Sequence, residues 1–373
     1  MNKDNIESAQ ERAALPKGMI IAGAWSWRLL AIFGVLAVVI YAASKITEVI
    51  IPFLIAILFA ALLVPIVNKL RAKGWPKALA VVTSLLGTLI IVSGLFVLIA
   101  TQIRRSLPDL ETRGKAAYES LKSFLVSPTV GFSQQDIDNA IGSIGKYAQE
   151  NSQVLTSGLT SAGTTFGHIL VGLLLALFSL IFILIDGKNI WNFFVRLFPT
   201  KARPAIAGSG EVSWTALKSF VRSQVIVAAV NGVGIGLGAF FIGLPLAIPI
   251  AIMVFLGSFI PVVGAILTGA VAMVIALIFN GPIAALVMLG VVILVQQAEG
   301  HILQPFLIGK AVHIHPLAIV LSVAIGTILG GIPGALFAVP VAAVLSKSIS
   351  YISNRTWEKE AKVVSVTKAK KTA

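Results

Sequence analysis

The stretch SQVIVAAVNGVGIGLGAFFIGLPLAIPIAIMVFLGSFIPVVGAIL, residues 223–267, opens the longest uncharged part of the chain. No Asp, Glu, Lys, Arg or His occurs between Ser223 and Ala298. A helix that crosses a bilayer needs about 20 apolar residues, so this part holds more than one such helix. Glycine and proline divide it, and we expect helices over Val225–Gly243, over Leu246–Phe279 with a break at Pro261, and over Ile283–Val295.

The rest of the chain repeats this pattern. Hydrophobic residues make up 57% of it and charged residues 12%, whereas a soluble domain has about 45–50% and 25%. The composition therefore predicts an all-α integral membrane protein with about eight membrane segments, two of them broken or re-entrant. The other apolar runs are Leu29–Ser44, Val49–Val67, Ala78–Ile103, Phe166–Ile185 and Leu317–Leu345.

Polar segments divide the chain into five expected regions. These are an N-terminal tail (1–24), three transmembrane helices (25–103), an extracytoplasmic helical loop (104–165), a C-terminal transmembrane core (166–346) with a cytoplasmic interfacial segment at 186–222, and a basic tail (347–373).

The basic residues predict the orientation in the membrane. If the apolar runs alternate in direction, 21 of the 29 Lys and Arg residues fall on one side, which the positive-inside rule assigns to the cytoplasm. This places both termini of a multi-pass protein of the cell membrane in the cytoplasm. It also accounts for the net charge of +14 without nucleic acid, because no basic stripe interleaved with aromatic residues is present.

Two of the apolar runs are too long for one ordinary crossing. Each contains an Ile-Pro followed by small residues, IPVVGAIL at 260–267 and IPGALFAVP at 332–340. Proline removes a helical hydrogen bond, and irregular backbone at membrane depth is tolerated only against protein or a water-filled cavity. The sequence is consistent with eight crossings, and equally with six crossings plus two re-entrant hairpins.

A polar stretch, QQAEGHILQPFLIGKAVHIHP at 296–316, interrupts the apolar runs. Glu299 is the only acidic residue between Glu211 and Glu358. A carboxylate at the centre of a bilayer costs about 3 kcal/mol by insertion scales, so it should pair, be protonated or face an interior. Glu299 is therefore a candidate ion-coupling residue, or an interfacial partner of Lys310.

Other polar residues near these segments are weaker candidates. His301, His313 and His315 favour polar loop positions over a proton relay, and His-x-His without a further ligand does not indicate a metal site. Arg222 and Gln224 stand at the entrance to the uncharged region, where they could bind a solute or anchor a helix end. No catalytic or nucleotide-binding motif occurs, so we expect neither an enzyme nor a cofactor, and any uphill transport must use an ion gradient.

Several segments together resemble the autoinducer-2 exporter family, also called the PerM-type permease family. The most specific is Glu-Gly-x-x-x-x-Pro-x-x-x-Gly-Lys, which Glu299, Gly300, Pro305, Gly309 and Lys310 match, continuing to His315 and Pro316. His301 and His313 depart from the residues frequent there. The other similar segments are Ile51–Val67, Phe220–Val230, Phe259–Leu267 and Ala338–Pro340.

The resemblance implies a multi-pass secondary transporter that exports a small polar solute such as autoinducer-2, with a sodium or lithium for proton antiporter as the alternative. A membrane scaffold that transports nothing is a third class. The implied partners are the solute, H⁺ or Na⁺, the lipid bilayer and, as an open option, further copies of the chain. The expected broken-helix positions are Pro261, Gly264, Pro305, Gly309, Pro333 and Gly334.

Overall fold

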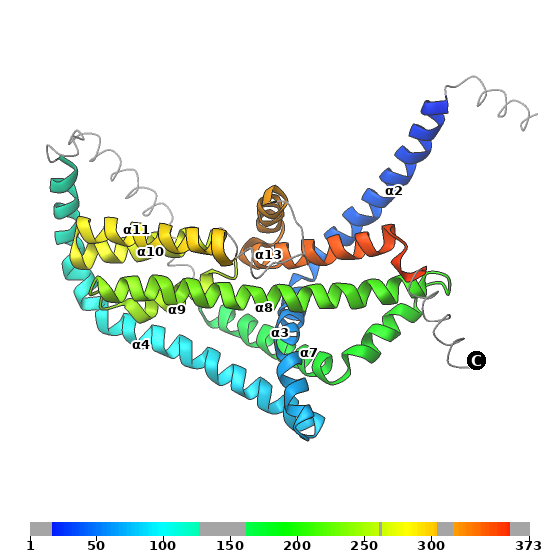
Figure 1. Ribbon diagram of the computed structural model, residues 1–373, viewed down its shortest axis with the longest axis horizontal. Helices are drawn as coiled ribbons and strands as arrows, with labels where there is room; N and C mark the ends of the chain where they lie inside the picture. The colour runs from blue at the N-terminus through cyan, green and yellow to red at the C-terminus, as the bar shows by residue number, and fades with distance from the viewer. Residues whose placement is uncertain (1–16, 127–161, 261–262, 304–315, 359–373) are drawn as a thin grey trace, which may run out of the picture. The chain divides into compact units, whose positions relative to one another are not determined.

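The structure is a computed structural model that describes residues 17–126, 162–260, 263–303 and 316–358 (Figure 1). These residues are helical throughout apart from short turns, and no strand occurs among them, which confirms the all-α prediction. The chain divides into two units, 1–51 and 52–373. The first contains α2 (Lys17–Lys45) and the beginning of α3 (Thr47–Ala72).

The apolar runs form helices, several of which extend beyond the run. The first three lie in α2, α3 and α4 (Lys77–Val126), and the fourth lies in α7 (Ala162–Arg196), which is kinked at Asp186. After a turn, α8 (Arg203–Phe241) begins, so residues 203–222 continue directly into the uncharged region. In the described part of the chain, six helices are long and apolar enough to cross a membrane, and the apolar part of α2 is shorter.

The next long apolar run forms two helices, α9 (Ala247–Gly257) and α10 (Val263–Asn280), that fold back on each other. A Cβ atom placed on Gly264 would lie 2.5 Å from the carbonyl carbon of Gly257. In a straight helix, residues seven apart would be separated by about 10 Å. The α9–α10 hairpin therefore reverses between these two glycines. At its base, Asn280 Nδ2 donates a hydrogen bond to the Ile242 carbonyl at 2.8 Å, which brings the end of α10 to the end of α8.

The last apolar run also turns back, within α13 (Pro316–Ser353). Gly330 and Gly331 leave helical geometry, and Gly331 has a φ of 60°, which glycine adopts without steric cost. A Cβ on Gly326 would lie 2.9 Å from the Ala338 Cβ, whereas a straight helix would separate those residues by about 18 Å. The α13 hairpin is visible as a sharp change of direction in Figure 1.

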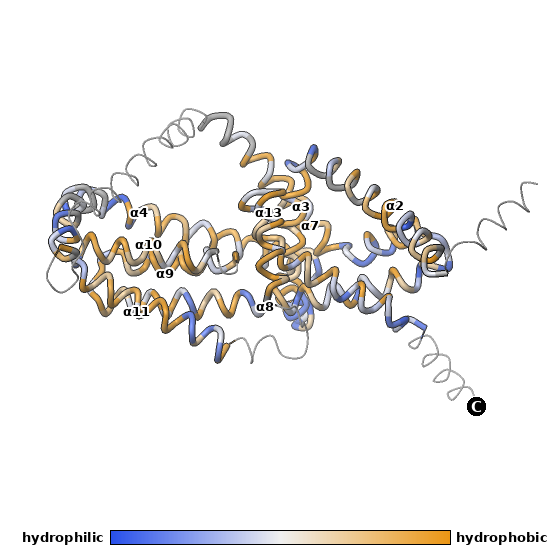
Figure 2. Tube along the Cα trace, turned by 90° about the horizontal axis from the view of Figure 1, so that it is seen from above, coloured by the Kyte–Doolittle hydropathy of each residue, from blue (hydrophilic) through white to orange (hydrophobic). Residues whose placement is uncertain are grey.

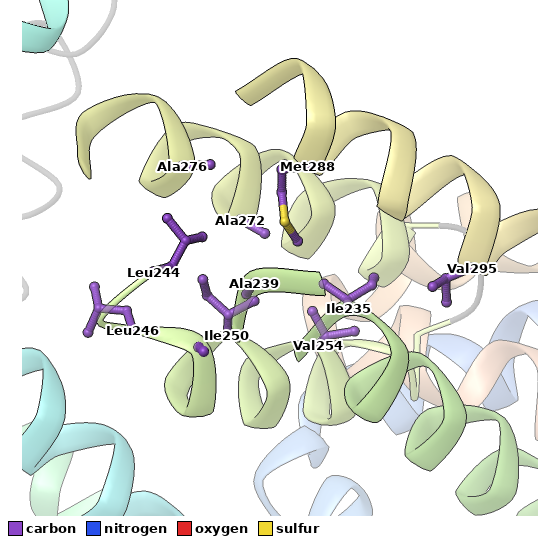
Figure 3. Packing of buried hydrophobic residues seen from close by; sticks show 11 residues of the cluster. Ile235, Ala239, Leu244, Leu246, Ile250, Val254, Ala272, Ala276, Met288 and Val295 are labelled. Carbon is purple, nitrogen blue, oxygen red and sulfur yellow. The ribbon is translucent and has the colours of Figure 1, made fainter. Parts of the chain in front are cut away.

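The main core lies where α8, the α9–α10 hairpin and α11 (Pro282–Ala298) meet. Figure 3 shows its side chains: Ile235 and Ala239 from α8, Leu244 and Leu246 from the connection, Ile250 and Val254 from α9, Ala272 and Ala276 from α10, and Met288 and Val295 from α11. In Figure 2 the hydrophobic colour covers α10 and α11, and hydrophilic residues return at the end of α11.

The glycines of GVGIGLG explain how closely these helices pack. A Cβ on Gly232 or Gly236 would collide with Ala251 in α9, and a Cβ on Gly234 would lie 2.9 Å from Val295 in α11. Residues four apart lie on one face of a helix, so α8 presents one glycine face to α9 and another to α11. The GVGIGLG segment, Gly232–Gly238, is therefore a helix-packing element.

Smaller clusters connect the remaining helices of the second unit. Residues of α3, α4 and α7 pack together around Leu63 and Val81. The α13 hairpin packs against Phe220 of α8 and against Ile260 at the tip of the α9–α10 hairpin. The two hairpins are therefore in contact, and both lie beside α8.

Candidate functional site

The uncharged region contains few polar side chains, and several of them gather at the tip of the α9–α10 hairpin. Asn231 comes from α8 and is 1% exposed, and Ser258 follows α9 and is 4% exposed. Glu299 is half-buried and follows α11, as the first residue of a π-helix, η1 (Glu299–Leu303). We call Asn231, Ser258 and Glu299, together with Gln224, the polar cluster.

The Asn231 amide lies at the centre of this cluster. Its Nδ2 donates a hydrogen bond to Glu299 Oε2 at 2.6 Å and a longer one to Ser258 Oγ at 3.4 Å. Ser258 Oγ donates in turn to the Val254 carbonyl at 2.7 Å. The contact with Glu299 is much the shorter of the two that Asn231 makes, and it is therefore the stronger.

Gln224 makes the second polar contact with the hairpin. Its Nε2 donates to the backbone carbonyl of Ser258. The last carbonyls of a helix have no partner within the helix and need one from elsewhere when they are buried. Gln224 therefore caps the C-terminal end of α9. It lies seven residues before Asn231, on the same face of α8.

Two buried polar atoms near the cluster have no hydrogen-bond partner among the described residues. They are Oδ1 of Asn231 and Nε2 of Gln296, the latter one turn before Glu299 on α11. A buried polar group without a partner costs about 1–3 kcal/mol, and in native proteins such groups usually meet water or a ligand. One acceptor and one donor are thus available beside the carboxylate.

The cluster lies well inside the helices that form it. Asn231 precedes the end of α8 at Phe241 by about 15 Å, and Ser258 follows the start of α9 by about 16 Å, at 1.5 Å per residue. Glu299 follows Pro282 by about 25 Å along α11 by the same measure. The hydrogen bond from Asn280 brings the end of α10 next to the end of α8. The ends from which these three lengths are measured therefore lie close together.

The other candidates from the sequence occupy different positions. Arg222 is exposed, and the described residues show no contact between it and the polar cluster. The exposed His301 ring contacts the carbonyl of Gln297 in its own helix, with Nδ1 at 3.1 Å from the oxygen. Gly264 and Gly334 lie at the crossings of the two hairpins, where each faces the backbone of the opposite arm. Pro333 lies just after the α13 turn.

Several candidates lie outside the described residues: Pro261, Pro305, Gly309, Lys310, His313 and His315. Over the described ranges, no group of three His, Cys, Asp or Glu side chains comes close enough to hold a metal ion.

Sequence reasoning missed Asn231 and Ser258. A lone asparagine in a glycine-rich apolar helix is the signal that could have found Asn231, because an amide in such a helix needs a buried partner. Its spacing of seven residues from Gln224 is a second signal. The spacing of residues along the helix does not identify the hydrogen-bond partner of Asn231, because Glu299 is 68 positions away in the sequence.

Comparison with known proteins identifies the family to which the chain belongs. Residues 29–354 match the family model described as AI-2E family transporter. The chain belongs to this family of transporters. It is 35% identical over 329 residues to "Putative transport protein MT0215" of Mycobacterium tuberculosis, covering 88% of this chain and 90% of the relative. It is 24% identical to "AI-2 transport protein TqsA" of Escherichia coli, with 85% and 90% covered.

Membership in the AI-2E family agrees with the helices. The protein is a multi-span helical membrane protein of a transporter family, and the resemblance noted from the Glu299–Pro316 motif is confirmed. A transporter needs a solute and works in a lipid bilayer, so both belong to its function.

Proposed function

We propose that this protein is a secondary transporter that exports a small polar solute, such as autoinducer-2, through the cytoplasmic membrane, using an ion gradient. The observation that carries the proposal is the polar cluster at the tip of the α9–α10 hairpin. Most of the region that supplies it is apolar, yet an amide, a hydroxyl and a carboxylate converge there.

The depth of the cluster supports this role. The hydrocarbon core of a bilayer is about 30 Å thick, so Asn231 and Ser258, about 15 Å from the helix ends, fall near its middle, and Glu299, about 25 Å along α11, lies deeper. Polar groups at that depth are expensive and mark solute or ion pathways. In many secondary transporters, substrate and ion sites lie near the midplane where helices are interrupted. The hairpin tip and the π-helix at Glu299 both provide such interruptions.

The hairpins also support one of the two topologies. At 11 residues, α9 is about 16 Å long and too short to cross. Both ends of the α9–α10 hairpin lie near the end of α8, as expected for a re-entrant segment. We therefore propose six crossings, by α2, α3, α4, α7, α8 and α11, plus the two hairpins of α9–α10 and α13, with both termini in the cytoplasm and the 304–315 segment on the cytoplasmic side.

Antiport of Na⁺ or Li⁺ against H⁺ is the second candidate function. The observation that favours it is the Glu299 carboxylate, the one acidic group within the cluster. A carboxylate that binds either a proton or a cation, but not both, can exchange one for the other. A scaffold without transport is the remaining class, and no contact in the cluster favours it.

Flux measurements separate these functions. We expect cells lacking the protein to retain autoinducer-2 that wild-type cells release, and Glu299→Gln to restore release poorly. Glu211→Gln is the matched control, because Glu211 is an exposed carboxylate on α8, and it should restore release fully. Release at the wild-type rate in the deletion cells would contradict export of this solute.

Proteoliposomes test the antiporter. Sodium or lithium added outside should collapse a pre-formed pH gradient if the protein exchanges cations for protons, and Glu299→Gln should remove this effect. If neither solute release nor the pH gradient depends on the protein, both transport functions are wrong. The scaffold is then the one of the three functions that is left.

A further inference from the structure

The Asn231 amide joins two elements that the sequence does not connect. An amide nitrogen has two hydrogens, and here one points to Glu299 and the other to Ser258 at the hairpin tip. The 2.6 Å bond to the carboxylate is much shorter than the 3.4 Å contact with Ser258. Glu299 therefore sets the orientation of the amide, and that orientation supplies the donor for Ser258.

The oxygen of the Asn231 amide is unfavourably placed in this orientation. Oδ1 of Asn231 is buried and has no partner among the described residues. Turning the amide over would bring Oδ1 toward the carboxylate, which repels it as long as the carboxylate is charged. The charge of Glu299 thus keeps the amide in place despite the missing partner for Oδ1.

A neutral group at position 299 changes this balance. A protonated carboxyl group has a hydroxyl to donate, and Oδ1 of Asn231 is a buried acceptor without a partner among the described residues. Turning the amide would pair this hydroxyl with Oδ1, and it would move Nδ2 away from Ser258 to the side where Oδ1 now has no partner. The hairpin would then keep the Gln224 contact, which does not involve Glu299.

We propose that Asn231 is a positioning residue that couples the charge of Glu299 to the α9–α10 hairpin. The tip is held by both Asn231 and Gln224 while Glu299 is ionised, and by Gln224 alone once Glu299 is neutral. This rests on the proposed role of Glu299 as the ion-coupling residue. It assigns to Asn231 the step by which a proton at Glu299 loosens the hairpin beside the solute path.

The surroundings make Glu299 the charged group that acts here. Residues 223–298, which include α9, α10, α11 and the part of α8 that carries Asn231, contain no ionisable Asp, Glu, Lys, Arg or His. Arg222 lies earlier on α8 and is exposed, and the His301 ring contacts the Gln297 carbonyl in its own helix. Among the described residues packed around the Asn231 amide, the charge therefore comes from Glu299.

Thiol labelling tests the coupling without any solute. The chain has no cysteine, so Phe259→Cys, one residue beyond Ser258, reports opening of the tip through its rate of reaction with N-ethylmaleimide. In this background we expect Asn231→Leu and Glu299→Gln each to raise the rate about tenfold, which corresponds to about 1.4 kcal/mol. The double variant should react no faster than either single variant, because both changes remove the same contact, that of Asn231 with Ser258.

Gln224→Leu is the matched control. It should also raise the labelling rate, but its effect should multiply with that of Glu299→Gln, because its contact with Ser258 is separate from the carboxylate. Ser258→Ala tests the coupling from the hairpin side, and Glu299→Gln should have no further effect in that background. Gel filtration of each purified variant checks that it is folded, and the Ser258→Ala pair provides the test if Asn231→Leu does not fold.

Two results would overturn the proposal. One is a labelling rate that Glu299→Gln leaves unchanged, and the other is an effect of Glu299→Gln that multiplies with that of Asn231→Leu. A purely structural asparagine gives the second result. Because labelling needs no flux, a protein that exports nothing but shows the coupling would refute the transport proposal alone.

Discussion

Replacing Gly264 by alanine should force the α9–α10 hairpin open. The added Cβ would lie 2.5 Å from the carbonyl carbon of Gly257 and closer still to its oxygen. Carbon atoms in contact are normally about 3.5–4.0 Å apart, so the two arms would have to separate by about 1 Å. Both colliding groups belong to the backbone, so no side-chain rotation can relieve the overlap.

The expected loss follows from this geometry. Adding a methyl group to a packed core typically costs about 1–3 kcal/mol, and a collision with backbone belongs at the upper end. At about 2 °C per kcal/mol for a large chain, the midpoint of thermal unfolding should fall by about 6 °C. The measurement is a thermal unfolding curve of the purified protein in detergent.

Gly290→Ala is the control for this prediction. Gly290 lies in α11, and a Cβ there would meet nothing within 4 Å. Alanine favours a helix over glycine by about 1 kcal/mol, so this variant should unfold at the wild-type temperature or slightly above it. If Gly264→Ala proved as stable as Gly290→Ala, the close crossing at Gly257 would be wrong.

Three further predictions concern the site and its surroundings. Glu299→Asp shortens the side chain by one methylene, so the carboxylate should lose Asn231 and solute release should fall toward that of Glu299→Gln; full release would contradict the need for this contact. Cysteine at Ala311, which lies outside the described residues, should react with an impermeant thiol reagent from the cytoplasmic side in inverted vesicles, and reaction from outside would favour eight crossings. Arg113 of α4 donates to the Phe279 carbonyl at 3.5 Å and lies 5.6 Å from the centre of its ring; Arg113→Met should cost about 1 kcal/mol, measured by thermal unfolding, and an unchanged midpoint would show that the contact contributes nothing.

The helices could be predicted from the sequence because lipid imposes a simple length rule. Every apolar run is helical, and the two long runs are interrupted near Pro261 and Pro333, where proline and glycine predicted a break. The glycines of GVGIGLG at 232–238 pack closely against α9 and α11, as small residues at helical spacing allow.

The candidate site could be predicted only in part. Glu299 was found because a lone acid in an apolar region is costly, and Gln224 was found at the entrance to that region. In the structure Gln224 caps α9, and its role in binding a solute stays a prediction. Asn231 and Ser258 were missed because neither is unusual alone, and their importance arises from meeting each other and Glu299.

The sequence by itself determined that this chain is a bundle of membrane helices with two interruptions, because the cost of exposing charge and backbone to lipid is local and can be counted along the chain. Tertiary structure decided whether each interruption kinks or reverses the chain, and which polar groups meet at its tip. Those outcomes depend on contacts between residues far apart, such as Asn231 with Glu299 and Ile260 with the α13 hairpin. Such contacts have no period in the sequence, since they depend on which helix faces pack together.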